Sequence, residues 1–342
     1  MTNVTLPQAV ALELTYRCNH RCVFCSCPWY YATNAYPLGQ ELTLELWRRA
    51  IDILFENGVK AFSISGGEAT LNESMPEIVD YIHKGCVKRG YNTPIVLISN
   101  GLLMNEKYLK LFSQSNVNLS MSLPGYETFA THTTVDNADG VLQWFRRAKE
   151  MGITTTLNVT VTAKNIHELF ETISMGLISG ASSLLLNRFL PGGRGLYNKD
   201  DLLLNNEQIN EMLDIAEEVL TLSNRYGSLG TEIPMCVVKE RAKYKRLNIG
   251  YKCAAAKGFF VVDPAGYIRV CNHSTKIVGN IFDTPMIGDI DYWNTFALSR
   301  YKPNVCSDCR HIDRCDASCR EVACILNGSP SAIDPTVAIS KL

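Results

Sequence analysis

The chain has 342 residues, of which 46% are hydrophobic and 20% charged, and its formal net charge is −1. A charge this close to neutral gives no reason to expect nucleic acid or an anionic membrane surface as a partner. No apolar run approaches the length of a membrane span, and the N-terminus lacks the pattern of a secretory signal, so we expect a cytoplasmic protein with one large domain and a smaller appended one.

The predicted elements alternate regularly along the first part of the chain. Apolar runs closed by turn residues predict six strands, at residues 10–14, 61–65, 95–99, 117–123, 154–162 and 183–189. Amphipathic stretches predict helices at residues 44–56, 75–88, 106–112, 140–151 and 166–179, and a further one at 202–226. Strands that alternate with helices indicate parallel βαβ units and an α/β fold.

Near Cys236 this alternation ends, and the rest of the chain is rich in loops and cysteines. We therefore expect a boundary near residues 228–240, with one domain over residues 1–230 and another over residues 231–342. In parallel sheets ligands bind at the carboxyl ends of the strands. The candidate site residues that follow strand ends are the cysteines of residues 18–25, Gly66, Gly67, Glu68, Ser99, Asn100, Ser122 and Arg188.

Directly after the first strand, Cys18, Cys22 and Cys25 have the spacing C-x3-C-x2-C. Thiolates at short spacing bind soft metal centres, either zinc or an iron–sulfur cluster. A structural zinc site needs a fourth ligand, and Cys27 and His20 do not repeat the paired spacing of a zinc ribbon. The alternative is a [4Fe-4S] cluster with one iron left open. Thirteen cysteines without a secretory signal favour metal binding in a reducing cytoplasm over disulfides.

The order strand, cysteine loop with an aromatic at Phe24, helix, strand and Gly-Gly-Glu resembles the opening of radical S-adenosylmethionine (SAM) enzymes. The resemblance implies a partial (β/α)6 barrel and SAM bound to the open iron. It also implies that Gly66, Gly67 and Glu68 meet the methionyl amino group and that the backbone beside Phe24 meets adenine. Ser99, Asn100 and Ser122 match positions that hold the ribose or carboxylate.

Each of these residues also has a purely structural interpretation. Gly66-Gly67 and Asn100-Gly101 are common turn pairs, and Glu68 is suited to the first turn of a helix. Arg188 is either a SAM contact or part of a salt bridge at the barrel rim. The chain also departs from the resemblance after the fourth strand, where Pro124 stands at the position that is commonly aspartate.

A second group of seven cysteines resembles the SPASM extension of radical SAM enzymes that modify peptides, which implies one or two auxiliary [4Fe-4S] clusters. By this resemblance Cys253, Cys271 and Cys319 share one cluster, and Cys306, Cys309 and Cys315 share the other. The remaining ligands are open: Cys324 completes the second cluster, or it serves the first while a non-cysteine ligand such as Asp334 completes the second. Because seven thiolates cannot fill eight sites, either one iron is left open or Cys236 supplies the missing bond. The metal ligands predicted in this group are Cys253, Cys271, Cys306, Cys309, Cys315, Cys319 and Cys324.

The other cysteines and the histidines carry weaker expectations. Cys86 is expected in a helix as a small core residue, and Cys27 either lines the site or packs on the neighbouring aromatic residues. Cys27 and Cys236 are candidate hydrogen-atom donors. The histidines, among them His132 and His273, show no metal spacing and are expected at the surface or at helix caps.

The resemblance implies an enzyme that cleaves SAM reductively and abstracts hydrogen from a substrate, with flavodoxin or ferredoxin as the reductant. We expect a ribosomally made peptide as substrate, to be crosslinked, joined by a thioether or oxidised. The alternative is dehydrogenation, epimerisation or decarboxylation of a sugar, aminoglycoside or nucleoside. About ten residues precede the first strand, so we also expect a separate peptide-recognition protein or direct capture of a short peptide.

Overall fold

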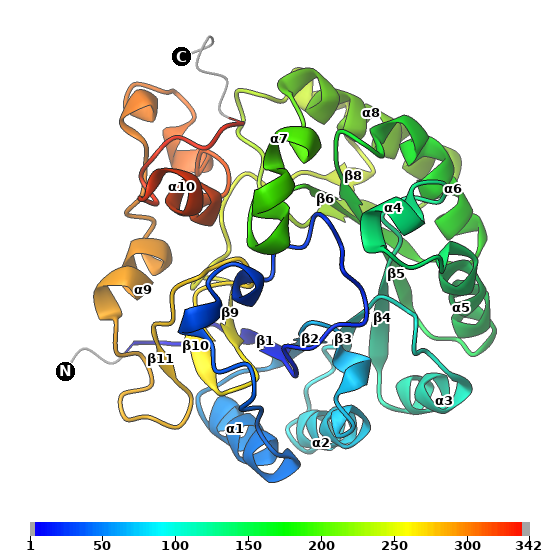
Figure 1. The fold of residues 1–342 in the computed structure, drawn as a ribbon, viewed down its shortest axis with the longest axis vertical. Helices are drawn as coiled ribbons and strands as arrows, with labels where there is room; N and C mark the ends of the chain where they lie inside the picture. Colours follow the sequence, from blue (N-terminus) through cyan, green and yellow to red (C-terminus); the bar gives the residue numbers. More distant parts are fainter. Residues whose placement is uncertain (1–3, 337–342) are drawn as a thin grey trace.

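The structure, a computed structural model, describes residues 4–336 of the chain. Eleven strands within these residues form one sheet in the order β11-β10-β9-β1-β2-β3-β4-β5-β6-β7-β8. From β9 through β1 to β8 each neighbouring pair is parallel. β10 pairs antiparallel with β9, and β11 pairs antiparallel with β10. The strands curve around a central space with helices outside them (Figure 1). The predicted α/β class and partial barrel are confirmed.

The six predicted strands agree with the structure to within one residue at each end. They are β1 (Ala9–Glu13), β2 (Ala61–Ser65), β3 (Ile95–Ser99), β4 (Val117–Ser122), β5 (Thr155–Val161) and β6 (Ser183–Arg188). Side chains alternate across these strands. In β5, Leu157 and Val159 belong to the apolar core outside the barrel, while Asn158 and Thr160 line the internal cavity.

The longer helices pack their apolar faces against the outside of the sheet. They are α1 (Leu44–Glu56), α2 (Met75–Lys88), α3 (Glu106–Gln114), α5 (Ala138–Glu150), α6 (Leu169–Ile178) and α8 (Asn206–Leu222). Two short helices, α4 (Phe129–Thr133) and α7 (Lys199–Leu202), lie in the segments that follow β4 and β6. Side-chain caps fix several of their starts, because an oxygen at the N-cap accepts a hydrogen bond from a free N–H of the first turn. The Thr43 hydroxyl caps α1 in this way, and Asn205 forms a capping box with Gln208 at α8.

One helix prediction was wrong at both ends. The stretch expected to be helical over residues 202–226 contains the end of α7, a break, and then α8. The physical reason is the cap: Asn205 takes an extended backbone conformation and begins a new helix, so the periodic pattern before it belongs to a separate turn.

The later part of the chain is loop-rich, as expected, but it also contributes strands to the sheet. These are β7 (Gly227–Leu229), β8 (Leu247–Asn248), β9 (Phe259–Val262), β10 (Tyr267–Arg269) and β11 (Gly279–Asn280). In β9, Phe260 pairs with Val10 of β1, so the sheet passes from one end of the sequence to the other. The division into residues 1–230 and 231–342 stays a prediction.

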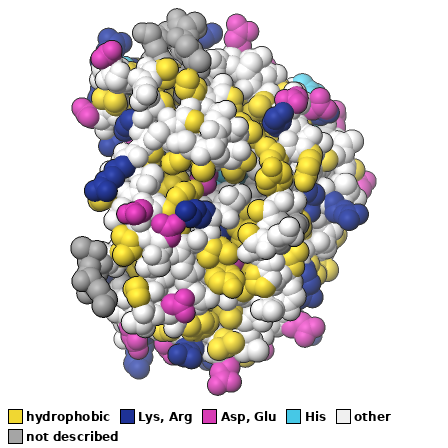
Figure 2. Space-filling view, turned by 60° about the vertical axis from the view of Figure 1, so that its left-hand side comes forward, with side chains coloured by type: hydrophobic (Ala, Val, Ile, Leu, Met, Phe, Trp, Pro, Cys, Tyr) yellow, Lys and Arg dark blue, Asp and Glu magenta, His cyan; other side chains and the backbone are white. Residues whose placement is uncertain are grey.

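The tail, here residues 231–336, lies beside the barrel and includes α9 (Ile290–Ala297) and α10 (Arg320–Asn327) (Figure 1). On the side of the molecule that carries these helices, positively and negatively charged side chains are interspersed rather than gathered into a single-sign field (Figure 2). Among the described residues, no helix is both long enough and apolar enough to cross a membrane.

Candidate functional site

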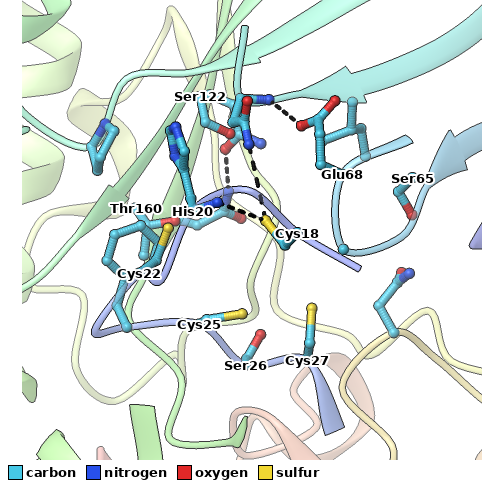
Figure 3. Close-up of a pocket in the computed structure, with 18 of the residues that line it drawn as sticks. Cys18, His20, Cys22, Cys25, Ser26, Cys27, Ser65, Glu68, Ser122 and Thr160 are labelled. Carbon is cyan, nitrogen blue, oxygen red and sulfur yellow. Dashed lines mark hydrogen bonds between the residues drawn. The ribbon is translucent and has the colours of Figure 1, made fainter. Parts of the chain in front are cut away.

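A cavity of about 410 Å³ lies at the carboxyl ends of the barrel strands. Cys18, Cys22, Cys25 and Cys27 contribute to its wall, and their side chains surround one space (Figure 3). Every predicted residue of the first cluster and of the SAM site lies along this wall. Those residues are Cys18, Cys22, Phe24, Cys25, Gly66, Gly67, Glu68, Ser99, Asn100, Ser122 and Arg188.

The loop that carries the three cysteines crosses the mouth of the barrel and is fastened to α4. The backbone N–H of Arg21 donates to the Thr133 carbonyl (3.0 Å), and that of Val23 donates to the His132 carbonyl (2.9 Å). These carbonyls lie at the end of α4, where intrahelical partners run out. The helix end therefore positions the middle of the cysteine loop.

A glycine-rich segment supports the other side of the loop. The N–H of Gly195 donates to the Cys25 carbonyl (3.0 Å). Gly193 has a φ of +49°, and a Cβ there would lie 2.4 Å from the Cys27 carbonyl oxygen. Only glycine allows both this conformation and this approach.

Gly66 and Gly67 bring the end of β2 against the same loop. The N–H of Gly67 donates to the Thr15 carbonyl (2.7 Å), and a Cβ on Gly67 would lie 2.1 Å from the Arg17 carbonyl oxygen. Gly66 has a φ of +143°. The close contact between these two backbone segments is therefore enough to explain why glycine occupies both positions, without any ligand.

Glu68 links the ends of β2 and β3. One carboxylate oxygen accepts hydrogen bonds from the hydroxyls of Thr70 (2.7 Å) and Ser99 (2.8 Å), and the other accepts from the Asn100 N–H (2.7 Å). The Asn100 side chain then donates to the Asn19 side chain (2.7 Å) in the cysteine loop. Burial raises the pKa of Glu68, while these donors lower it. The network joins three loops around the cavity.

A cation missed by the sequence analysis, Arg194, lies beside the thiols. Its guanidinium stacks 3.6 Å from the centre of the Tyr30 ring and donates to the Cys22 carbonyl (3.4 Å). Burial raises the pKa of Cys18 to about 11 and also raises the pKa of Cys22, and Arg194 acts against both shifts. The pKa of Cys25 is lowered to about 7 by its hydrogen bond with Cys27 and by Arg194. The signal in the sequence that could have identified Arg194 is its position among Gly192, Gly193 and Gly195, shortly after the end of β6.

The histidine expectation was wrong for three residues, because His20, His132 and His273 are buried. Two of them have a polar partner inside the protein: the ring of His132 bonds to the Thr162 hydroxyl (3.0 Å) and that of His273 to the Pro191 carbonyl (3.0 Å). The His132 ring also packs on Phe24, with centroids 5.9 Å apart. Cys86 is a buried core residue of α2, as predicted, and Cys27 both lines the cavity and packs on the aromatic cluster of Tyr16, Trp29 and Tyr36.

Arg188 forms the salt bridge of its structural interpretation, and its contact with SAM stays a prediction. Its side chain is buried, lines the cavity, and pairs with Asp334 of the tail at 3.5 Å. The same cavity wall carries uncharged polar side chains among apolar ones such as Leu185: Asn158 accepts a hydrogen bond from Asn187 (2.9 Å), and Thr160 and Thr231 also line the cavity. Ser122 lies on the same wall (Figure 3). The asparagines were missed because the sequence does not reveal which face of a strand lines the cavity.

The tail cysteines form two groups. In one, burial and the neighbouring Cys271 and Cys319 raise the pKa of Cys253. In the other, burial and the neighbouring Cys309, Cys315 and Cys236 raise the pKa of Cys306. The sulfur of Cys324 lies 3.9 Å from the Tyr292 hydroxyl, and Glu321 is a neighbour of both Cys324 and Cys271.

The thiols are the donors that an iron–sulfur cluster uses, and their places in the fold fit such clusters. Among residues 4–336, no three or more His, Cys, Asp or Glu side chains are arranged to hold a single metal ion. An iron–sulfur cluster does not require that arrangement, because each thiolate binds a different iron. The donor chemistry and the placement around a cavity therefore fit a cluster at Cys18, Cys22 and Cys25.

The barrel carries a recognisable family profile. Residues 12–175 match the family model described as the Radical SAM superfamily. Along the whole chain, the sequence is 26% identical over 364 residues to "PqqA peptide cyclase" from Bradyrhizobium diazoefficiens, covering 98% of this chain and 87% of that protein. It is 26% identical over 329 residues to "Mycofactocin maturase MftC" from Mycolicibacterium smegmatis, covering 92% of this chain and 78% of that protein.

Solved structures share the fold. Streptococcus suis SuiB bound to S-adenosylmethionine superposes with a TM-score of 0.72 at 15% identity, over 99% of this chain and 78% of that one. The structure described as native anSMEcpe with bound AdoMet and Cp18Cys peptide gives a TM-score of 0.71 at 17% identity, over 98% and 95%.

Proposed function

We propose a function from the premise that this chain belongs to the radical SAM superfamily, in its SPASM subfamily: it is an enzyme that uses a [4Fe-4S] cluster and SAM to modify a ribosomally made peptide. The observation that carries the proposal is the cavity itself. Three thiols on one loop face it, and Gly66-Gly67-Glu68 contributes to the wall of the same cavity.

In this proposal Cys18, Cys22 and Cys25 hold the cluster and leave one iron for SAM. When bound, the cluster and SAM supply a 5′-deoxyadenosyl radical that removes hydrogen from the substrate. Glu68, Ser99 and Asn100 form a pre-arranged polar wall for the methionyl end of SAM, because their mutual hydrogen bonds fix their positions before the ligand arrives.

The opposite part of the cavity is suited to the rest of the ligand and to the substrate. Phe24 and Ser122 line it on the side of α4 and β4. We propose that Phe24 marks the adenine position, and that Ser122 and Arg188 contact the ribose or carboxylate of SAM. The protein positions these groups and excludes water from the reacting atoms.

A peptide is the substrate class that the relatives and the cavity favour together. Relatives include a peptide cyclase and a maturase by name, and a related structure is described as holding a peptide. The inner wall offers the amides of Asn158 and Asn187 and the hydroxyl of Thr160, which suit backbone amides. We further propose flavodoxin or ferredoxin as the reductant and a separate protein that presents the peptide.

The two thiol groups of the tail are proposed to hold auxiliary clusters that exchange electrons with the substrate. Cys253, Cys271 and Cys319 form one group, and the Cys306, Cys309 and Cys315 group the other. The ion pair of Arg188 with Asp334 connects the active cavity to the tail.

The test is anaerobic reconstitution followed by reduction with dithionite in the presence of SAM. The wild-type protein should release 5′-deoxyadenosine, and Cys22→Ala should release none above background. Cys86→Ala, which alters a buried thiol of α2 away from the cavity, is the matched control and should retain SAM cleavage. No 5′-deoxyadenosine from reduced wild-type protein would overturn the proposal.

The peptide assignment has its own readout. Short peptides encoded beside the gene are incubated with the reduced enzyme and SAM, and their masses are then measured by mass spectrometry. A change of mass confined to one peptide, absent with Cys22→Ala, is the expected result. SAM cleavage without modification of any such peptide, but with modification of a sugar or nucleoside, would contradict the peptide assignment alone.

A further inference from the structure

Four thiols meet at the outer side of the tail, although one of them is far from the others in sequence. Cys306 packs with Ala317 in a small core cluster, and Cys236 and Cys309 pack against that cluster. The sulfur of Cys315 accepts hydrogen bonds from the N–H of Met235 (3.4 Å) and of Ala317 (3.3 Å). The backbone N–H of Met235, the residue before Cys236, is thus in direct contact with the Cys315 sulfur.

Cys236 is held in this place by a turn that is tied to α8. The Val237 N–H donates to the Pro234 carbonyl (3.0 Å), which closes the turn. The Val237 carbonyl accepts from the Asn210 side chain of α8 (3.0 Å), and the Met235 carbonyl accepts from the Arg241 guanidinium (2.9 Å). These bonds fix the backbone on both sides of Cys236, so its thiol is presented to the group in a defined position.

The two other candidates for a fourth ligand are engaged elsewhere. The Tyr292 hydroxyl donates to Glu321 (2.9 Å) and lies 3.9 Å from the Cys324 sulfur, and these contacts place Cys324 on the α9 side of α10. Asp334 is fully buried, pairs with Arg188 at 3.5 Å, and accepts from the Thr336 N–H (2.8 Å). Neither side chain has a recorded contact with Cys306, Cys309 or Cys315 among the described residues.

We propose that Cys236, Cys306, Cys309 and Cys315 are the four thiolate ligands of one iron–sulfur cluster, which therefore has no open iron. The inference deepens the proposed function, on which it rests for the presence of auxiliary clusters. Four cysteines are the usual complement of a closed [4Fe-4S] cluster.

The charges around the group suit such an anion. A surface cavity of about 640 Å³ borders Cys236 and Cys309, and its wall carries Lys239, Arg241 and Arg310. One acidic side chain, Asp308, lies on the same wall. Cations near a cluster with four thiolates offset its negative charge. A closed cluster in this position is suited to carrying electrons rather than to binding substrate.

The proposal assigns the ligands of the second tail group by subtraction. Cys253, Cys271 and Cys319 remain for the other cluster, with the Glu232 carboxyl as a further neighbour of Cys253 and Cys319. Cys324 also remains, and it shares the neighbour Glu321 with Cys271.

The experiment measures metal in the chain that carries Cys18→Ala, Cys22→Ala and Cys25→Ala, so that only tail clusters contribute. We expect about eight irons per chain after anaerobic reconstitution. Adding Cys236→Ala should either remove about four irons or leave a three-iron cluster with its own EPR signal. Cys236→Ser, which offers an oxygen ligand, should keep the iron but shift the reduction potential of that cluster.

Cys86→Ala in the same background is the matched control and should retain the full iron content. Unchanged iron and an unchanged EPR spectrum in Cys236→Ala would overturn the assignment. Zinc in place of iron in the starting protein would overturn it as well. This experiment does not measure SAM cleavage. Failure of the proposed function would instead be detected as a lack of 5′-deoxyadenosine release from the wild-type protein.

A second measurement avoids any variant that fails to fold. Wild-type protein is alkylated anaerobically before and after iron removal by a chelator, and the labelled cysteines are identified by mass spectrometry. Before iron removal, Cys236 should be protected from alkylation together with Cys306, Cys309 and Cys315. After iron removal, all four should become labelled. Equal labelling of Cys236 before and after iron removal would contradict the proposal.

Discussion

At the scale of single residues, charge balance around the cysteine loop rests on Arg194. Its guanidinium reaches the Cys22 and Cys25 region from behind the loop and is itself held by Tyr30. A cation in a partly buried site stabilises nearby negative charge more than a cation in water does. The electron that reduces the first cluster adds negative charge at this place.

We therefore predict that Arg194→Gln makes the first cluster harder to reduce. A unit charge at a few ångströms, with an effective dielectric constant of about 20, corresponds to a potential shift on the order of 100 mV towards negative values. The measurement is an EPR-monitored redox titration of the reconstituted protein. Arg194→Lys should keep most of the wild-type potential, and Arg21→Gln, an exposed arginine of the same loop, should leave it unchanged. A wild-type potential in Arg194→Gln would contradict this role.

The same region marks what the sequence can predict about single residues. Cys18, Cys22 and Cys25 could be singled out because their spacing is local and their chemistry is specific. Asn158 and Asn187 reach the same cavity from β5 and β6, and Arg194 reaches it from the segment after β6, so only the fold brings them there. His132 was misplaced for a related reason: its burial depends on a loop that crosses above it.

At the scale of elements, the barrel mouth is built from loops that touch backbone to backbone. The end of β2 and the cysteine loop after β1 are joined through Gly67, Thr15 and Arg17, with no side chain between them. Such a contact is intolerant of any added atom, because neither backbone can move without breaking strand pairing. The spacing between cluster and SAM sites depends on it.

Gly67→Ala should therefore separate the two loops. The new Cβ would lie 2.1 Å from the Arg17 carbonyl oxygen, so we expect a loss of about 1–3 kcal/mol in the free energy of unfolding and poor iron incorporation. Denaturant unfolding of the metal-free protein and iron analysis of the reconstituted protein measure these effects. Gly39→Ala is the control, because no atom lies within 4 Å of its Cβ position. Equal stability of the two variants would contradict the packing argument.

Elements differed in how well the sequence predicted them. Strands β1–β6 and helices such as α2 were recognised because each is five or more residues long with a regular apolar pattern. Strands β7, β8 and β11 have two or three residues, too few to establish a period. The four apolar residues of β9 become a strand through pairing with the distant β1, which the sequence pattern does not reveal.

At the scale of the whole molecule, two buried ion pairs connect the barrel to the tail. Arg269 of β10 pairs with Glu13 at the end of β1, and Arg188 pairs with Asp334. Glu13 also accepts a hydrogen bond from Asn272 (3.0 Å), and both Glu13 and Asn272 line the cavity. The tail thus forms part of the active cavity as well as of the sheet.

We predict that breaking the Glu13–Arg269 pair destabilises the entire protein. Arg269→Met leaves a buried carboxylate without its cation, which typically costs about 3–5 kcal/mol. Glu13→Gln together with Arg269→Met should recover a large part of that loss, because no unpaired charge remains buried. Urea unfolding of the metal-free protein gives the comparison, and Arg147→Met, at an exposed ion pair, should change stability by less than about 1 kcal/mol. If the double variant is no more stable than Arg269→Met, charge burial is not the cause.

The pairing of β1 with β9 also has a consequence for the chain while it is being made. β1 leaves the ribosome first, yet one of its edges stays without a partner until β9 has been synthesised near the other end of the sequence. An unpaired strand edge is a template for joining another chain. Each nascent copy therefore carries an open edge through most of translation, and neighbouring copies on one messenger RNA present the same edge to each other.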